Sequence, residues 1–210
     1  MKKNVKILCL SFLLLLFSYS LFAKPISTQR QDLIDSAFEL LGTEYVWGGK
    51  TPVPGIDCSG LVAFTSRKGI NVNFTGNAQT MYDASQKVKK SKREPGDLLF
   101  FSENNSTSNI THVGIYLGKY TGDGKFHNKH LFIHSASGGN PNGVIVSSID
   151  DKSYWTQHYM GCGRYLPSSA EATQRVRARG PKSIQSSKKE FEKDDWWKDV
   201  DVEKWFGDKS

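Results

Sequence analysis

The spacing of apolar positions predicts an amphipathic helix at the start of the folded part of the chain. Between residues 28 and 41, apolar side chains recur at the three- and four-residue intervals of one helix face. Thr28 and Gln31 fit a capping box at the start of this helix, and Gly42 is suited to end it. The apolar stripe consists of Leu33, Ile34, Ala37, Phe38, Leu40 and Leu41.

A second helix is predicted from residue 57 to about residue 68, with Gly69 ending it, and a short third helix within residues 75–83. Asp57 or Ser59 can cap the second helix, which places Cys58 in its first turn. The free N–H groups and the dipole at a helix start favour a thiolate over a thiol. Because the thiolate is the form of cysteine that attacks carbonyl groups, the pattern predicts that Cys58 is a nucleophile.

Short apolar runs separated by turns predict an antiparallel sheet in the second half of the chain. The expected strands cover residues 98–101, 112–118, 131–136, 144–146 and 163–166, and the last of them is expected to close the sheet. A turn at residues 94–97 precedes the first strand, and Asp97 is expected to act only as a turn residue. Because helices come first and strands follow, the fold class is α+β.

The two ends of the chain differ in composition from the region between them. Residues 1–23 combine lysines, an apolar run and small residues, which predicts a secretory signal peptide cleaved after Ala23. The apolar run is shorter than the roughly 20 residues of a spanning helix, so no stable membrane anchor is expected after cleavage. One domain is predicted at residues 24–167. Residues 168–210 form a charged, Trp-containing tail that is either a flexible segment or a helix docking on a partner.

The predicted export and the net charge limit the compartments and the partners that suit this chain. The formal net charge of the whole chain is +7 at pH 7, which suits an anionic neighbour such as a cell-wall polymer. Nucleic acid is a poor partner for an exported chain without a recognition module. Both the periplasm and the extracellular cell wall remain open as destinations. Cys58 and Cys162 follow the predicted signal peptide; a disulfide is one possibility, but a buried free thiol is favoured for Cys162.

A cysteine nucleophile needs a base and a group that orients the base. Of the five histidines, His112 begins one expected strand and His134 lies in its hairpin partner, so the two rings can meet. His127 and His130 are expected to be exposed in a hairpin loop, and His158 to be packed among aromatic residues. The same Cys58, His112 and His134 also suit zinc, but the helix start favours a nucleophile, and no metal or cofactor is expected.

The order of several motifs resembles the NlpC family, bacterial papain-like cysteine endopeptidases of the cell wall. The resemblance extends over about residues 27–166. The motifs are residues 45–49 (YVWGG), 55–62 (GIDCSGLV), 95–101 (PGDLLFF), 112–118 (HVGIYLG) and 133–136 (IHSA). The resemblance implies a papain-like α+β core with the cysteine on a helix packed against an antiparallel sheet. It also implies a catalytic triad of Cys58, His112 and His134.

The resemblance also implies a substrate and roles for neighbouring residues. Tyr45 is expected to reach toward Cys58 and the oxyanion, whereas Trp47 is expected in the core. Residues matching Asp57 and Ser59 recognise a stem-peptide amine in some family members. The implied reaction is hydrolysis of peptidoglycan stem peptides, typically between γ-D-glutamate and the diamino acid. The alternatives are a peptidoglycan amidase, a thiol acyltransferase, or a wall-binding protein without activity.

Overall fold

The computed structural model describes residues 26–138, 142–150 and 153–166 of the 210-residue chain. The helices are α2 (Ile26–Phe38), α3 (Cys58–Ile70), α4 (Ala78–Ala84) and α5 (Tyr154–Gln157), with a 3₁₀ turn η1 (Lys90–Lys92). The predicted signal peptide and tail lie outside the described residues. No helix within those residues is both long enough and apolar enough to cross a membrane.

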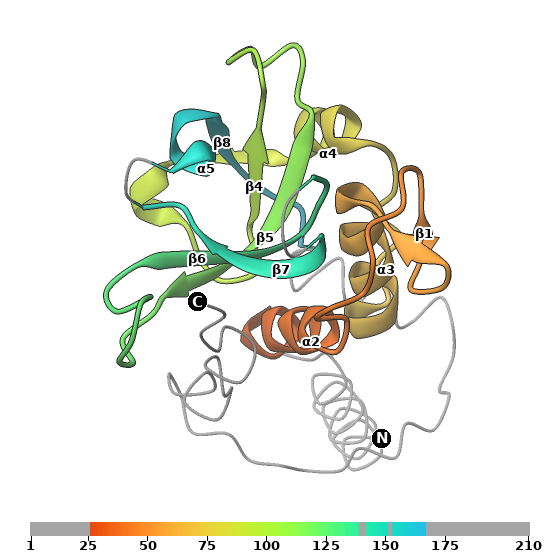
Figure 1. The fold of residues 1–210 in the computed structure, drawn as a ribbon, viewed down its shortest axis with the longest axis horizontal. Coiled ribbons are helices and arrows are strands. Elements are labelled where there is room, and N and C mark those ends of the chain that lie inside the picture. Colours follow the sequence, from red (N-terminus) through yellow and green to blue (C-terminus); the bar gives the residue numbers. More distant parts are fainter. Residues whose placement is uncertain (1–25, 139–141, 151–152, 167–210) are drawn as a thin grey trace, which may run out of the picture.

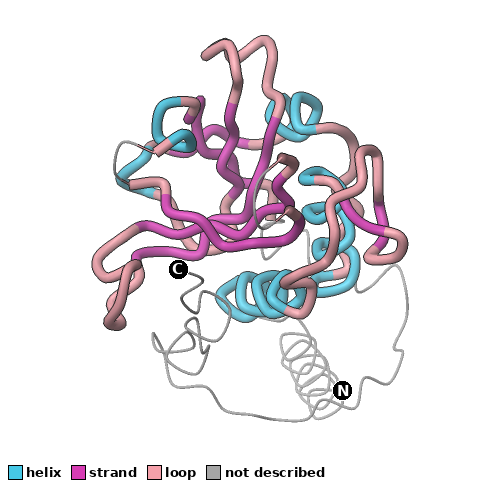
Figure 2. The backbone as a smooth tube through the Cα atoms, viewed as in Figure 1, coloured by secondary structure: helices cyan, strands magenta, loops and turns pink. Residues whose placement is uncertain are grey.

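The strands form one large antiparallel sheet and a separate small hairpin. The hairpin pairs β1 (Lys50–Thr51) with β2 (Gly55–Ile56). The sheet has the order β3-β8-β4-β5-β6-β7. Its strands are β3 (Gln86–Val88), β4 (Leu98–Phe101), β5 (His112–Lys119), β6 (His130–Ala136), β7 (Gly143–Ser148) and β8 (Tyr159–Arg164). Helices α2 and α3 lie beside each other along this sheet (Figure 1), and the strands of the sheet gather apart from these two helices (Figure 2), which confirms the α+β class.

The last strand does not close the sheet, contrary to the sequence prediction. Strand β8 lies inside the sheet between β3 and β4, and β3 forms the edge. The sequence prediction missed β3 because its three residues, Gln86–Val88, are polar or only partly buried and show no apolar alternation.

Strand β4 is buried on both faces, which explains its uninterrupted apolar sequence. Leu98 and Phe100 belong to the core between the sheet and the helices. Leu99 and Phe101 belong to a second cluster on the opposite face, where Trp155 of α5 packs against it. The sheet is therefore the middle layer of the domain.

The helix bounds differ from the sequence prediction at both ends of α2 and at the end of α3. Helix α2 begins at residue 26, so Thr28 is an internal residue and cannot serve as its cap. Helix α3 continues through Gly69 to Ile70, and Asn71 caps it in a left-handed conformation with φ of 55°. Gly69 instead permits close contact between the helices, because a Cβ there would lie 2.5 Å from the carbonyl oxygen of Asp32 in α2.

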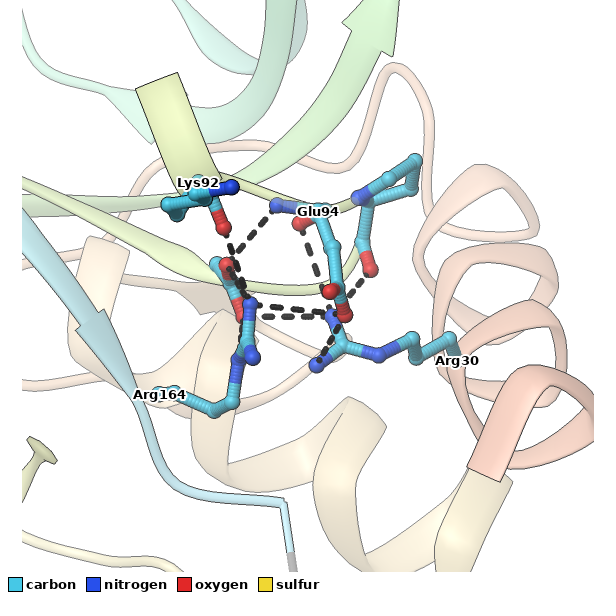
Figure 3. Close-up of polar contacts among 6 residues, drawn as sticks. Arg30, Lys92, Glu94 and Arg164 are labelled. Atoms are coloured by element: carbon cyan, nitrogen blue, oxygen red, sulfur yellow. Dashed lines mark hydrogen bonds and ion pairs between the residues drawn. The ribbon is translucent and has the colours of Figure 1, made fainter. Parts of the chain in front are cut away.

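Asp97 is the centre of a buried charge cluster, so the prediction that it is only a turn residue is wrong. Its side chain is fully buried and accepts hydrogen bonds from Arg30 Nη1 at 3.1 Å and Arg164 Nε at 2.8 Å. Arg164 Nη2 donates to the second carboxylate oxygen at 2.8 Å. Glu94 pairs with both guanidinium groups, at 3.1 and 3.3 Å (Figure 3). A buried carboxylate needs such partners, and this one connects α2, the start of β4 and the end of β8.

Candidate active site

Close backbone packing fixes the position of the α3 start. The Asp57 N–H donates to the carbonyl of Gly49 at 3.0 Å, and Ser135 Oγ of β6 donates to the carbonyl of Ile56 at 2.7 Å. A Cβ at Gly60 would lie 2.1 Å from the carbonyl oxygen of Gly49. Because position 60 carries no side chain, the β1–β2 hairpin can lie directly against the first turn of α3.

Cys58 is the first residue of α3, and its thiol lies against the start of β5. The residue is 9% exposed, and the sulfur has hydrogen bonds to the backbone of Val113 and of Ser59. Burial raises the pKa of the Cys58 thiol to about 11, although both backbone hydrogen bonds oppose the rise. The sequence analysis expected the helix start to favour a thiolate. Burial outweighs that effect in the described structure, so the resting sulfur is a neutral thiol.

His112 and His134 lie next to each other on strands β5 and β6. His112 Nε2 and His134 Nδ1 are 2.9 Å apart, and the two rings are nearly perpendicular. Burial lowers the pKa of His112 to about 4, against an opposing effect of the Asp57 charge. Burial also lowers the pKa of His134, and the neighbouring His112 lowers it further. Both imidazoles are therefore neutral near pH 7.

Two residues that the sequence analysis did not identify complete the surroundings of the histidines. Ser147 Oγ of β7 lies 2.9 Å from His134 Nε2. Trp155 of α5 packs against both rings, at centroid distances of 4.8 Å from His112 and 4.5 Å from His134. The signal for Ser147 is strand alternation: Ile145 pairs with His134, so Ser147, two residues on, lies on the same face. The expected strand ended at residue 146 and missed it.

Gly114 allows β5 and β6 to approach each other beside the histidine pair. A Cβ at this position would lie 2.6 Å from the Phe132 ring and 3.0 Å from the Cβ of His134. The Phe132 ring in turn stacks on His134, with the centroids 4.5 Å apart. The imidazole of His134 is therefore held from several sides.

Asp57 and Ser59 lie beside the cysteine and form one hydrogen-bonded group with Lys50. Asp57 caps α3 by accepting from the Gly60 N–H, and Ser59 Oγ donates to Asp57 Oδ1 at 2.9 Å. Lys50 Nζ donates to Asp57 Oδ2 and to Ser59 Oγ, each at 2.9 Å. Lys50 was not identified from the sequence, where it is a single lysine after two glycines without further signal.

The structure brings Tyr45 close to the cysteine but keeps Trp47 away from the core. Burial raises the pKa of the Tyr45 hydroxyl, electrostatic interactions with Cys58 and Asp57 add to the rise, and a hydrogen bond with Ser137 opposes it. Trp47 is 88% exposed, so its assignment to the core is wrong. It lies at a turn of the backbone next to Gly48, whose φ is +75°.

The remaining histidines and Cys162 lie outside this site. His127 is exposed as expected, but His130 is half-buried against the Tyr116 hydroxyl, contrary to expectation. His158 packs against Tyr154, with the ring centroids 4.2 Å apart. Cys162 is a buried free thiol, which confirms the favoured alternative to a disulfide. Among the described residues, no group of three His, Cys, Asp or Glu side chains is arranged to hold a metal ion.

A helix that begins at a cysteine and packs on an antiparallel sheet carrying two adjacent histidines defines a papain-like α+β domain. The model of the NlpC/P60 family matches residues 42–164, and the chain belongs to this family. This confirms the resemblance stated from the sequence motifs.

Curated relatives and solved structures agree with this assignment. The chain is 32% identical over 146 residues to a gamma-DL-glutamyl hydrolase of Bacillus subtilis, covering 69% of this chain and 32% of the relative. It is 31% identical to the murein DD-endopeptidase MepH of Escherichia coli, over 63% of this chain and 45% of the relative. The chain thus spans less than half the length of these relatives. A solved NLP/P60 family structure from Staphylococcus aureus superposes with a TM-score of 0.53 at 31% identity, covering 67% and 42% of the two chains.

Proposed function

We propose that this protein is a cysteine endopeptidase that hydrolyses peptidoglycan stem peptides, with Cys58 as nucleophile, His112 as base and His134 as the residue that orients His112. The observation that carries the proposal is the hydrogen-bonded line from His112 through His134 to Ser147, together with the hydrogen bond between the Cys58 sulfur and the backbone of Val113, the residue that follows His112. The relatives include a gamma-DL-glutamyl hydrolase and a murein DD-endopeptidase, which supports the substrate class.

One arrangement of protons suits this line to base catalysis. His134 Nε2–H donates to Ser147 Oγ, which leaves His134 Nδ1 as an acceptor for His112 Nε2–H. In that tautomer His112 keeps the lone pair of Nδ1, the ring nitrogen not used in the contact with His134. His112 Nδ1 is then the atom that takes the proton from the thiol of Cys58.

Acyl transfer follows from the same groups. The sulfur of Cys58 attacks the substrate carbonyl as its proton passes to His112, and the resulting oxyanion is stabilised by the backbone N–H of Cys58 and the Tyr45 hydroxyl. The His112 imidazolium then gives its proton to the leaving amine. Because burial makes this imidazolium unusually acidic, the transfer to the amine is favourable. Water hydrolyses the thioester by the same steps in reverse order.

Purified peptidoglycan tests the reaction and the bond. We expect the wild-type protein to release soluble stem-peptide fragments whose masses correspond to cleavage between γ-D-glutamate and the diamino acid. The Cys58→Ala variant, which lacks the sulfur, should release none. Fragment masses that correspond to cleavage at the glycan–peptide bond would identify an amidase instead, and products extended by an acceptor amine would identify an acyltransferase. Undiminished release by Cys58→Ala, or wall binding without any release, contradicts the proposal.

The proposal includes export of the protein to the periplasm or the cell wall, where its substrate lies. The composition of residues 1–23 supports a cleaved signal peptide, a domain at residues 24–167 follows it, and residues 168–210 form a tail that can contact a partner. N-terminal sequencing of the protein recovered from outside the cytoplasm tests the cleavage after Ala23. Recovery of the uncleaved chain only from the cytoplasm contradicts it.

A further inference from the structure

The carboxylate nearest to the proposed nucleophile already has a cationic partner within the protein. Lys50 Nζ lies 3.2 and 2.9 Å from the two oxygens of Asp57 and 2.9 Å from Ser59 Oγ. Asp57 also accepts from the Ser59 hydroxyl and from the Gly60 N–H. Three of these contacts fall on Oδ1 and the fourth, from Lys50, falls on Oδ2, so the lysine binds both oxygens of the carboxylate.

The backbone keeps this lysine in place. Lys50 belongs to β1, where it pairs with Ile56, and the neighbouring carbonyl of Gly49 holds the Asp57 N–H. The side chain of Asp57 is 11% exposed and that of Lys50 is 53% exposed, so the lysine is the more solvent-exposed partner of this ion pair. A ligand that reaches Asp57 therefore meets an ammonium group already bound to both carboxylate oxygens.

We infer that Lys50 is a specificity-determining residue that makes the site beside Cys58 select a stem peptide whose N-terminus is acylated and uncharged. The inference rests on the proposed function. A free peptide ammonium would need acceptors that Lys50 occupies, and it would meet a like charge. A stem peptide still joined by an amide to its muramyl sugar carries no such charge. The selected substrate is thus the intact wall, rather than short peptides released from it.

A pair of peptides that differ only at the N-terminus tests this preference. The probes are L-Ala-γ-D-Glu-diaminopimelate with a free amine and its N-acetyl form. We expect the wild-type protein to have a kcat/KM for the acetylated peptide about tenfold or more above that for the free amine. In Lys50→Met, which keeps the length but removes the charge, the ratio should fall by about tenfold, mainly through a lower KM for the free amine.

Two control variants test whether the change in the ratio is due to the charge at position 50. Lys50→Arg keeps a cation at position 50 and should keep the wild-type ratio. Lys68→Met removes a lysine that pairs with Glu39 near the other end of α3, and it should also leave the ratio unchanged. A wild-type preference for the free amine, or an equal ratio in Lys50→Met and wild type, overturns the inference.

The rate at which thiol reagents label Cys58 tests the effect of the Lys50 charge without a peptide substrate. The probes are neutral methyl methanethiosulfonate and cationic 2-aminoethyl methanethiosulfonate; Cys58→Ser measures background, since Cys162 is buried. We expect Lys50→Met to raise the rate of the cationic probe relative to the neutral one by about threefold or more. A change in the ionisation of the Cys58 thiol affects both labelling rates equally, so it does not alter their ratio.

A raised ratio without stem-peptide cleavage by any of these proteins overturns the proposed function but supports the role of Lys50. An unchanged ratio overturns that role.

Discussion

The protonation states of Cys58 and His112 near pH 7 follow from the burial of both side chains, which raises the pKa of the thiol and lowers that of the imidazole. In the proposed mechanism a neutral thiol transfers its proton to a neutral imidazole during attack, so the protonation state of each group sets one limit of the active pH range. In the proposed mechanism, His134 donates to Ser147 and accepts from His112, which leaves Nδ1 of His112 free to act as the base. Side chains on three neighbouring strands would then act on one sulfur.

The pH dependence of kcat/KM tests this balance. Because burial lowers the pKa of His112 to about 4, we expect the base to stay neutral, and activity to stay constant, down to about pH 5. Below about pH 4 protonated His112 cannot accept the thiol proton, so activity should fall. Above about pH 11 the thiol is ionised and supplies no proton for the leaving amine. An acid limit at about pH 6.5 would instead indicate that the base has the ordinary pKa of an exposed histidine, which contradicts the effect of burial.

Ser147→Ala tests the end of the hydrogen-bonded line. Loss of the acceptor leaves the buried Nε2–H of His134 unpaired and releases the tautomer that the proposed mechanism needs. We expect kcat to fall about tenfold, the equivalent of about 1.4 kcal/mol, with little change in KM. The neighbouring Ser148→Ala serves as a matched control and should retain activity. Equal activity of both variants would mean that Ser147 does not position His134.

The surroundings of a single residue could be predicted from the sequence where they are determined by its neighbours along the chain. The pairing of His112 with His134 follows from two adjacent strands of a hairpin, and the burial of Cys162 from its context. Lys50 and Ser147 reach the site from other segments, and no local pattern indicates such a contact. Trp47 was misassigned because exposure depends on how the hairpin turns.

At the scale of elements, glycines determine how closely the β1–β2 hairpin, α3 and the sheet pack. Gly60 and Gly49 bring the hairpin against the α3 start, and Gly114 brings β5 against β6. The bounds of strands β4, β5 and β6 were close to those expected from apolar runs and turns. Strand β3 and the hairpin were missed because strands of two or three residues carry too few positions for a pattern.

Gly60→Ala tests the packing of the hairpin on α3. The added Cβ would lie 2.1 Å from the Gly49 carbonyl oxygen, so the backbone must move, and we expect a loss of about 2 kcal/mol or more in the free energy of unfolding. Activity should also fall, because Lys50 and Cys58 lie on the two sides of this contact. Denaturant unfolding and kcat/KM measure the two effects.

Gly48→Ala provides the comparison for Gly60→Ala. Position 48 has φ of +75° but no neighbouring atom within 4 Å of an added Cβ, so only backbone strain of about 1 kcal/mol is expected. A smaller loss of stability for Gly60→Ala than for Gly48→Ala would contradict the close-packing argument.

At the scale of the whole molecule, the charge cluster around Asp97 connects segments from both ends of the described chain. Arg30 comes from the first described helix and Arg164 from the last strand, and both bind one buried carboxylate (Figure 3). This cluster could not be predicted from the sequence, because its members are far apart along the chain and Asp97 follows Pro95 and Gly96 in an ordinary turn pattern.

Asp97→Asn tests the cluster with almost no change in shape. Removal of the negative charge leaves two guanidinium groups without their buried partner, so we expect a loss of about 3 kcal/mol or more in the free energy of unfolding. Glu94→Gln is the matched control: Glu94 pairs with the same arginines but is half-exposed, so its loss should be about 1 kcal/mol or less. Equal losses for the two variants in denaturant unfolding would contradict the central role of Asp97.

The interior position of β8 has a consequence for biosynthesis. Because the strand that lies between β3 and β4 is made last, a growing polypeptide has a gap in its sheet until residue 164 has left the ribosome. Until then the backbone groups of β4 that β8 will bind are unpaired, and the arginine contributed by β8 has not reached Asp97. The domain therefore completes its fold after translation of its final strand, rather than piece by piece from its N-terminus.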